Sequence, residues 1–175
     1  RTVLWAAGVA GSPLAAAIAK ETGAPLDRAG RIEVLPDLTV AGHPEIFVIG
    51  DVGALRDSSG KPLPGVAQVA MQEGRYVGKV IGARLEGRKA PAPFRYFDPG
   101  SMATIGRAAA IADIRGLRLT GYPAWLFWLF LHLMFLVKFG NRLLVFIQWA
   151  WSYLTWNRSA RLITGEERGD VSRAR

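Results

Sequence analysis

The sequence contains no cysteine and only two histidines among its 175 residues. Without cysteine, the chain has no disulfide bonds, no cysteine-ligated zinc or iron–sulfur site and no cysteine nucleophile. One histidine, His43, falls in a predicted turn and the other, His132, in an apolar segment, so no metal site is predicted. Hydrophobic residues make up 50% of the chain and charged residues only 21%, which indicates a folded protein rather than a disordered one.

Acidic residues are absent from Ile114 to Gly165, although the net charge of the whole chain is +8. This stretch holds five of the six tryptophans and six unopposed basic residues, which are Arg115, Arg118, Lys138, Arg142, Arg158 and Arg161. Basic residues that flank long apolar runs are typical of a segment seated on a membrane. A nucleic-acid-binding arm would interleave them with polar residues, so we predict an anionic membrane surface as partner and no nucleic acid.

The chain opens on Arg1–Trp5, which has the pattern of a strand already under way and lacks an initiator methionine. We therefore expect the C-terminal part of a longer protein, with a processed mature N-terminus as the alternative. Met102–Ile105 and Ala109–Ile114 are predicted to form a hairpin. The composition predicts four regions: an α/β region at 1–90, a short strand and turn region at 91–121, membrane-associating helices at 122–163 and a polar tail at 164–175.

The first region alternates short strands with a helix. Val3–Trp5 is predicted as a buried strand that ends in small residues, which allow a ligand to approach the backbone. Leu14–Thr22 is predicted as a helix with Gly23 at its C-cap. Gly30–Val34 alternates apolar and polar residues, which predicts a half-exposed strand.

Four apolar residues, Ile46–Ile49, predict a buried parallel strand that ends at Gly50 and Asp51. Ligands of open α/β sheets lie outside the carboxyl ends of the strands, where an acidic side chain can accept hydrogen bonds from ligand hydroxyls. The alternative is that Asp51 only caps a turn.

A helix is predicted from Gly65 to about Ile81. The free N–H groups of its first turn carry partial positive charge and can face an electron-rich ligand edge. Gln68 and Gln72 are four residues apart, so they share one face of the helix. Two neutral amides on one face could hydrogen-bond a dicarbonyl such as a quinone headgroup, or they could simply be solvated surface residues.

Three stretches of the sequence resemble a known family. Thr39 followed after six residues by Ile46–Asp51 resembles the second flavin motif of the two-dinucleotide-binding-domain flavoproteins. The run Ala67–Gln72 resembles the quinone-site motif of type II NADH dehydrogenases, the non-proton-pumping NADH:quinone oxidoreductases. Tyr96–Gly106 resembles the C-terminal domain of that family, and we assign it a packing role. The resemblance extends from about Thr2 to Ile163.

The resemblance implies an enzyme in which NADH passes a hydride to FAD and the reduced FAD passes two electrons to a membrane quinone. It implies no covalent catalytic residue and no metal ligand in this chain. The implied flavin-binding residues are Ala7, Gly8, Gly50, Asp51, Val66, Ala67 and Gln68. The implied quinone-binding residues are Ala67, Gln68, Met71 and Gln72.

The implied fold class is α/β: the C-terminal portion of a Rossmann-like FAD-binding domain, then a small strand-containing region and amphipathic membrane-seating helices. The implied location is the cytoplasmic face of the cell inner membrane, peripheral or monotopic, with a homodimer as one possible assembly. Because the glycine-rich FAD and NADH fingerprints are not among these residues, we expect the isolated chain to be inactive. The alternatives are another membrane-associated FAD-dependent pyridine-nucleotide oxidoreductase and a non-catalytic membrane anchor module.

The apolar segment is predicted to form two short helices. Pro123–Phe139 has 17 residues, about 25 Å of helix, whereas a bilayer core needs about 30 Å. Lys138–Arg142 is predicted to break the helix. Leu143–Trp156 is predicted as an interfacial helix with a narrow polar stripe at Gln148, Ser152 and Thr155. The alternatives are a shallow transmembrane hairpin and a buried pair of core helices.

Overall fold

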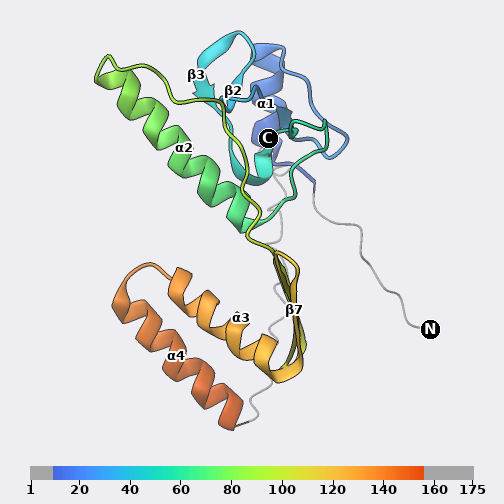
Figure 1. Cartoon of the computed structure of the whole chain (residues 1–175). Helices are drawn as coiled ribbons and strands as arrows, with labels where there is room; N and C mark the ends of the chain where they lie inside the picture. The colour runs from blue at the N-terminus through green and yellow to red at the C-terminus, as the bar shows by residue number, and fades with distance from the viewer. Residues whose placement is uncertain (1–9, 156–175) are drawn as a thin grey trace, which may run out of the picture. The chain divides into compact units, whose positions relative to one another are not determined.

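The computed structural model describes residues 10–155 (Figure 1). Two compact units divide the chain, Arg1–Asp98 and Pro99–Arg175, and each is described by itself. The expected α/β class is confirmed in its coarse form, because both units combine helices with small sheets. The predicted strand at Val3–Trp5 and the predicted ligand contacts of Ala7 and Gly8 lie outside the described residues.

The first unit begins with helix α1, Pro13–Thr22, and the predicted helix is confirmed with a start one residue earlier. The side chain of Ser12 accepts a hydrogen bond from the Leu14 N–H at 3.3 Å, which caps the first turn. Gly23 ends the helix in the left-handed conformation with φ 72°, and its N–H donates to the Ala19 carbonyl. This end matches the predicted C-cap, since glycine adopts positive φ without steric cost.

A short parallel pair follows. Strand β1, Ile32–Glu33, pairs with β4, Gly53–Ala54, which comes directly after the 3-10 turn η1, Gly50–Val52. The predicted strand Gly30–Val34 is thus shortened at both ends. Its first part lies in a turn closed by the Asp27 carboxylate, which accepts hydrogen bonds from the backbone and side chain of Arg31.

The predicted buried parallel strand at Ile46–Ile49 is wrong. Strand β3, His43–Phe47, instead pairs antiparallel with β2, Thr39–Val40. Only two residues separate β2 from β3, and Gly42 among them adopts φ 80°, so the chain reverses in a tight turn. The run is also not uniformly buried, because Ile49 is 37% exposed.

Helix α2, Ala67–Leu85, is the longest element of the first unit and overlaps the predicted helix, with both ends shifted toward the C-terminus. It buries a stripe at roughly four-residue spacing against the small core of this unit. Arg84 near its end donates to the Pro44 carbonyl at 2.7 Å and lies over the Phe47 ring, which fastens α2 to β3. Gly87, with φ 64°, follows the helix and reverses the chain.

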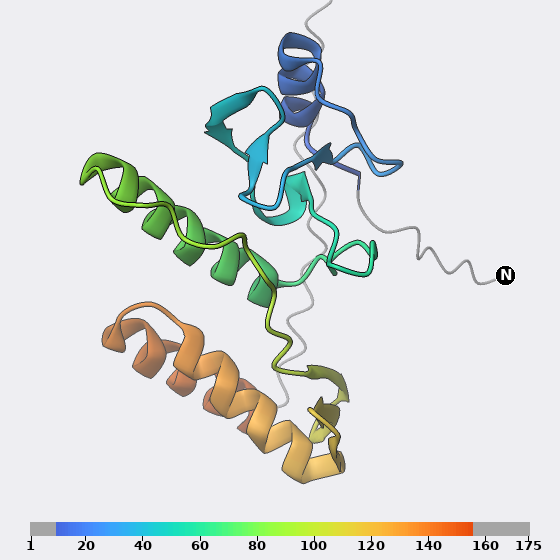
Figure 2. The ribbon, with the colours of Figure 1, turned by 45° about the horizontal axis from the view of Figure 1, so that its top comes forward.

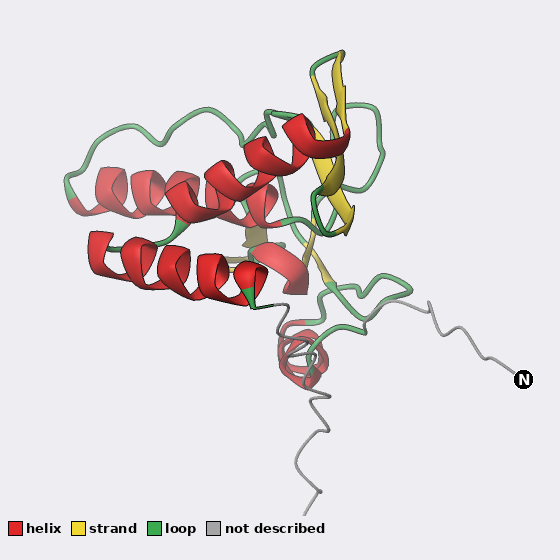
Figure 3. Cartoon of the chain, turned by 90° about the horizontal axis from the view of Figure 1, so that it is seen from below, coloured by secondary structure: helices red, strands yellow, loops and turns green. Residues whose placement is uncertain are grey.

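The second unit contains a three-stranded antiparallel sheet in the order β5-β6-β7 (strands yellow in Figure 3). The predicted hairpin is confirmed as β5, Ser101–Gly106, and β6, Ala109–Ile114. The third strand, β7, Leu117–Thr120, was not predicted. Helix α3, Gly121–Phe135, follows and packs on the sheet. The packed core is made of three alanines, Ala110, Ala112 and Ala124.

Helices α3 and α4, Phe139–Leu154, form an antiparallel pair, and Figures 1 and 2 show them side by side. The helical conformation is interrupted between them at residues 136–138, where Lys138 adopts φ 72°. The predicted break across Lys138–Arg142 is therefore placed too late, because residues 140–142 already lie in the first turn of α4. The Arg142 side chain donates to the Leu136 carbonyl at 2.9 Å, and this bond ties the connection to the helix.

Neither α3 nor α4 meets the length that a membrane crossing requires, and among residues 10–155 no other helix is both long and apolar enough to do so. The two short helices predicted for the apolar segment thus correspond to α3 and α4.

Candidate functional site

The candidate site begins at the turn that follows β3. Gly50 has φ 68°, a conformation that favours glycine, and its N–H donates to the Glu73 carboxylate at 2.6 Å. Its neighbour Asp51 has an exposed side chain. The hydrogen bond from Gly50 to helix α2 therefore fixes the turn that presents Asp51 to the surroundings.

Glu73 is the group that holds this turn, and sequence reasoning missed it. Its side chain is only 4% exposed although it is a carboxylate. Burial raises the pKa of Glu73 above its ordinary value, the Gly50 N–H lowers it, and the negative charge of Asp51 raises it again. The signal in the sequence is its place in the buried stripe of α2, four residues from both Val69 and Val77.

The start of α2 lies beside the same turn. Val66, the N-cap, is extended, and among the described residues no side chain caps the helix through a hydrogen bond there. A Cβ placed on Gly65 would lie 3.6 Å from the Asp51 Oδ1 atom, so the carboxylate and the helix start are neighbours. Gly50, Asp51, Gly65 and Val66 line one shallow depression, and Ala67 and Gln68 follow in the first helical turn.

This arrangement fits the group that the sequence predicted. The carboxylate of Asp51 can accept hydrogen bonds from hydroxyl groups, as in a polyol chain. The first-turn N–H groups of α2 carry partial positive charge and suit an edge of carbonyl and ring nitrogen atoms. An acceptor and a set of donors side by side are the complement that a flavin with its ribityl chain requires.

The two glutamines of α2 have different surroundings. The side-chain amide of Gln72 donates to the Phe97 carbonyl at 2.8 Å and accepts from the Phe97 N–H at 3.0 Å. Gln72 thus anchors a later segment of the same unit and has both amide atoms engaged. Gln68 and Met71 are half-buried in the first part of the helix. Of the predicted quinone-binding pair, Gln68 is therefore the better placed to meet a ligand.

The helical pair of the second unit exposes large apolar side chains. Phe130 is 58% exposed, and Val137 and Phe139 are each 77% exposed. His132 lies on α3, where its Nδ1 atom contacts the Trp128 carbonyl at 2.8 Å and its ring lies 4.1 Å from the Trp128 ring. The described residues contain no cluster of side chains that could hold a metal ion, and His132 packs on its own helix.

Two family models and several known proteins are similar to this chain. Residues 1–74 match the family model of the pyridine nucleotide-disulphide oxidoreductases, and residues 99–156 match the model of the NDH2 C-terminal domain. The chain is 42% identical over 167 residues to the type II NADH:quinone oxidoreductase Ndh of Mycobacterium tuberculosis, which covers 94% of this chain and 35% of the relative. It is 46% identical over 167 residues to NdhA of the same organism, with 93% of this chain and 34% of the relative covered.

A solved structure of NDH2 from Plasmodium falciparum in complex with NADH shares the fold. The TM-score is 0.68 at 18% sequence identity, and the match covers 92% of this chain and 46% of that chain. The chain spans about a third of the length of the two curated relatives above.

The two family-model matches, together with the two relatives at 42% and 46% identity, define the class as the pyridine-nucleotide oxidoreductases. The chain belongs to the type II NADH:quinone oxidoreductase family and corresponds to the C-terminal part of its members. The resemblance drawn from the sequence is thereby confirmed.

Proposed function

We propose that the protein to which this chain belongs transfers electrons from NADH through FAD to a membrane quinone without pumping protons. The observation that carries the proposal is the placement of the Asp51 carboxylate beside the open start of α2, held by the hydrogen bond from Gly50 to Glu73. Bound FAD would supply the two-electron chemistry that links hydride transfer from NADH to quinone reduction.

The residues of this chain bind and orient the flavin in this proposal. Asp51 accepts hydrogen bonds from the ribityl hydroxyls, and Gly50 allows the close backbone approach. The N–H groups of Ala67 and Gln68 face the flavin edge that gains negative charge on reduction, so the helix dipole favours the reduced state. Val66, whose own N–H donates to the Pro64 carbonyl, lies beside that edge as the N-cap. Ala7 and Gly8 remain predicted flavin contacts.

Gln68 takes the quinone role. Its neutral amide can donate to a quinone carbonyl without adding charge to the site. Ala67 and Met71 lie one position before and three positions after it, and we propose that they line the same binding region. Gln72 supports the site by holding Phe97 through its two backbone hydrogen bonds.

The second unit seats the enzyme on the membrane. A lipophilic quinone stays in the bilayer, so the flavin must be brought to the membrane surface. The exposed apolar side chains of α3 and α4 can enter the interface, while basic residues such as Arg142 meet anionic headgroups. We place the protein on the cytoplasmic face of the inner membrane as a peripheral or monotopic enzyme, and homodimer formation stays a prediction.

The flavin spectrum of the full-length protein tests the proposal. We expect a yellow protein with flavin absorption that NADH bleaches and a soluble quinone restores. A colourless protein would exclude every flavoprotein function. A flavin that NADH reduces but quinone fails to reoxidise would favour the alternative of another pyridine-nucleotide oxidoreductase.

A further inference from the structure

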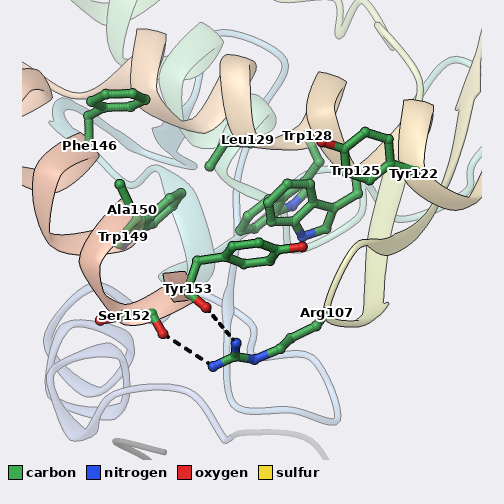
Figure 4. A pocket seen from close by; sticks show the side chains of 10 residues that line it. All are labelled: Arg107, Tyr122, Trp125, Trp128, Leu129, Phe146, Trp149, Ala150, Ser152 and Tyr153. Atoms are coloured by element: carbon green, nitrogen blue, oxygen red, sulfur yellow. Dashed lines mark hydrogen bonds between the residues drawn. The ribbon is translucent and has the colours of Figure 1, made fainter. Parts of the chain in front are cut away.

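A groove of about 470 Å³ runs between α3 and α4, wholly within the second unit (Figure 4). Its volume is in the range of small-molecule sites, which is about 300–1,000 Å³. Aromatic side chains from both helices form most of its walls. The lining residues are Arg107, Tyr122, Trp125, Trp128, Leu129, Phe146, Trp149, Ala150, Ser152 and Tyr153.

The lining of the groove is mostly apolar. Rings of the two helices contact each other in its walls: the Trp128 and Trp149 rings stack with centroids 5.7 Å apart, and the Trp125 and Tyr153 rings lie 5.4 Å apart. From Phe146 to Tyr153 the wall runs seven residues along α4, about 10 Å of helix. An apolar wall that follows one helix over this length suits a segment of a hydrocarbon chain.

One end of the groove is charged. The Arg107 guanidinium comes from the β5–β6 turn and donates to the carbonyls of Ser152 and Tyr153 at 3.2 and 3.0 Å, as the dashed lines in Figure 4 show. Among the described residues that line the groove there is no acidic side chain, and the sequence from Ile114 to Gly165 contains none. The groove thus offers one cationic end and an otherwise apolar length.

The outer surface of the same helices shows where an occupant would come from. Val137, Phe139 and Leu154 on α4 and its connection are each at least 75% exposed. Contact of this surface with a bilayer would place the groove next to lipid chains and the Arg107 end next to their headgroups.

We propose that the groove binds one acyl chain of an anionic phospholipid, with the phosphate at the Arg107 end. This inference rests on the proposed membrane seating but adds a distinct claim. Interfacial seating requires only the outward side chains, whereas the groove predicts a bound lipid in fixed proportion to the protein.

Two variants of the full-length enzyme separate these claims. Ala150 lines the groove, so Ala150→Phe fills it, while Ile147→Phe adds the same ring at a 55% exposed position outside the lining. Native mass spectrometry of the detergent-purified protein counts retained lipids. We expect about one phosphatidylglycerol per chain in the wild type and in Ile147→Phe, and at least a roughly fivefold loss in Ala150→Phe because the ring takes the place of the chain.

The flavin content and far-ultraviolet circular dichroism of Ala150→Phe establish that it is folded. A second measurement on the wild type uses acyl-brominated lipids, which quench tryptophan fluorescence on contact. Brominated phosphatidylglycerol is expected to quench more strongly than brominated phosphatidylcholine at equal concentration. Equal quenching would contradict the anionic headgroup.

Equal lipid retention by the two variants would overturn the proposal. The proposal would also fail if the retained molecule were a quinone and not a phospholipid. It would fail too if Ala150→Phe changed the oligomeric mass but not the amount of retained lipid. NADH:quinone activity and vesicle binding are measured in parallel. A wild-type protein that showed neither would refute the proposed function, and the lipid count would still decide whether the groove binds a lipid.

Discussion

The two units differ in which side chains they bury and which they expose. The first unit buries the carboxylate of Glu73 and uses it to hold a glycine turn, whereas the second unit turns large rings outward around a core of three alanines. A buried carboxylate is costly unless it accepts hydrogen bonds, and exposed rings are costly unless something covers them. This contrast supports the proposed division of roles, in which the first unit shapes a polar binding site and the second unit meets an apolar phase.

The contrast extends to single exposed apolar residues. Leu85 at the end of α2 is 83% exposed and Phe139 at the start of α4 is 77% exposed. Leu85 has one exposed large apolar neighbour on α2, Ile81, whereas Phe139 belongs to a helix pair on which many large apolar side chains are exposed.

The largest effect is expected from Phe139→Glu in the full-length enzyme. Removing one inserted phenyl ring costs about 1.5–3 kcal/mol of membrane binding, or roughly tenfold to hundredfold in vesicle affinity. Leu85→Glu introduces the same charge at a similarly exposed position and should leave the affinity within about twofold, since an exposed surface position contributes little. Sedimentation with vesicles containing phosphatidylglycerol measures both, and equal losses would remove the distinction between the units.

The next effect concerns the buried carboxylate. Glu73→Leu removes the acceptor of the Gly50 N–H and is expected to lower the free energy of unfolding by about 1–3 kcal/mol and to reduce the flavin content of the purified protein. Glu73→Gln keeps an acceptor oxygen at the same place and should retain most of the flavin. Flavin absorption per protein measures the difference. If Glu73→Leu retained as much flavin as the wild type, the turn at Gly50 would not depend on its hydrogen bond to Glu73.

A smaller effect separates two arginines of the second unit. Arg107 donates to two carbonyls at the end of α4, whereas Arg118 is 83% exposed and forms an ion pair with Asp113. Arg107→Gln should cost about 0.5–1.5 kcal/mol of stability through the lost bonds. Arg118→Gln should cost roughly 0–1 kcal/mol, as exposed pairs do. Thermal unfolding compares them, and the reverse order would show that Arg107 does not hold α4.

The smallest effect is a pH dependence. Because burial raises the native-state pKa of Glu73 above its ordinary value of 4.5, the native state keeps a proton that the unfolded chain has released. The contribution of Glu73 to the free energy of unfolding is therefore highest at low pH and falls as pH rises from 4.5 through the raised native pKa. The difference in melting temperature between wild type and Glu73→Gln should shift in favour of the glutamine variant over that range. A constant difference would show that Glu73 titrates normally.

Local signals in the sequence predicted several elements well. Gly23 marked the end of α1, and the short strand candidates Met102–Ile105 and Ala109–Ile114 on either side of a turn marked the hairpin, because turn residues act over few residues. The apolar run at Ile46–Ile49 was misassigned, because four apolar residues do not tell a parallel strand from an antiparallel one. Its partner was decided by the short turn at Gly42.

The candidate site was predictable only in part. Gly50, Asp51 and the start of α2 carried recognisable spacing, and the structure brings them together. Glu73 was missed because a glutamate on a helix is ordinarily solvated, and its bond to Gly50 joins residues 23 positions apart. The aromatic groove was missed for the same reason, since it depends on how α3 and α4 pack rather than on either helix alone.

The most direct test of the central claim is the ratio of two activities in a Gln68→Leu variant of the full-length enzyme, with Gln148→Leu as the matched control on α4. Quinone reduction by NADH and dye reduction by NADH are measured on the same preparations, with the flavin content of each. We expect Gln68→Leu to lower quinone reduction by at least about tenfold, the order expected when the hydrogen-bond partner of a bound carbonyl is lost, while dye reduction and the control variant stay near the wild-type level. Equal loss of both activities, or no loss of either, would contradict the assignment of Gln68 to the quinone.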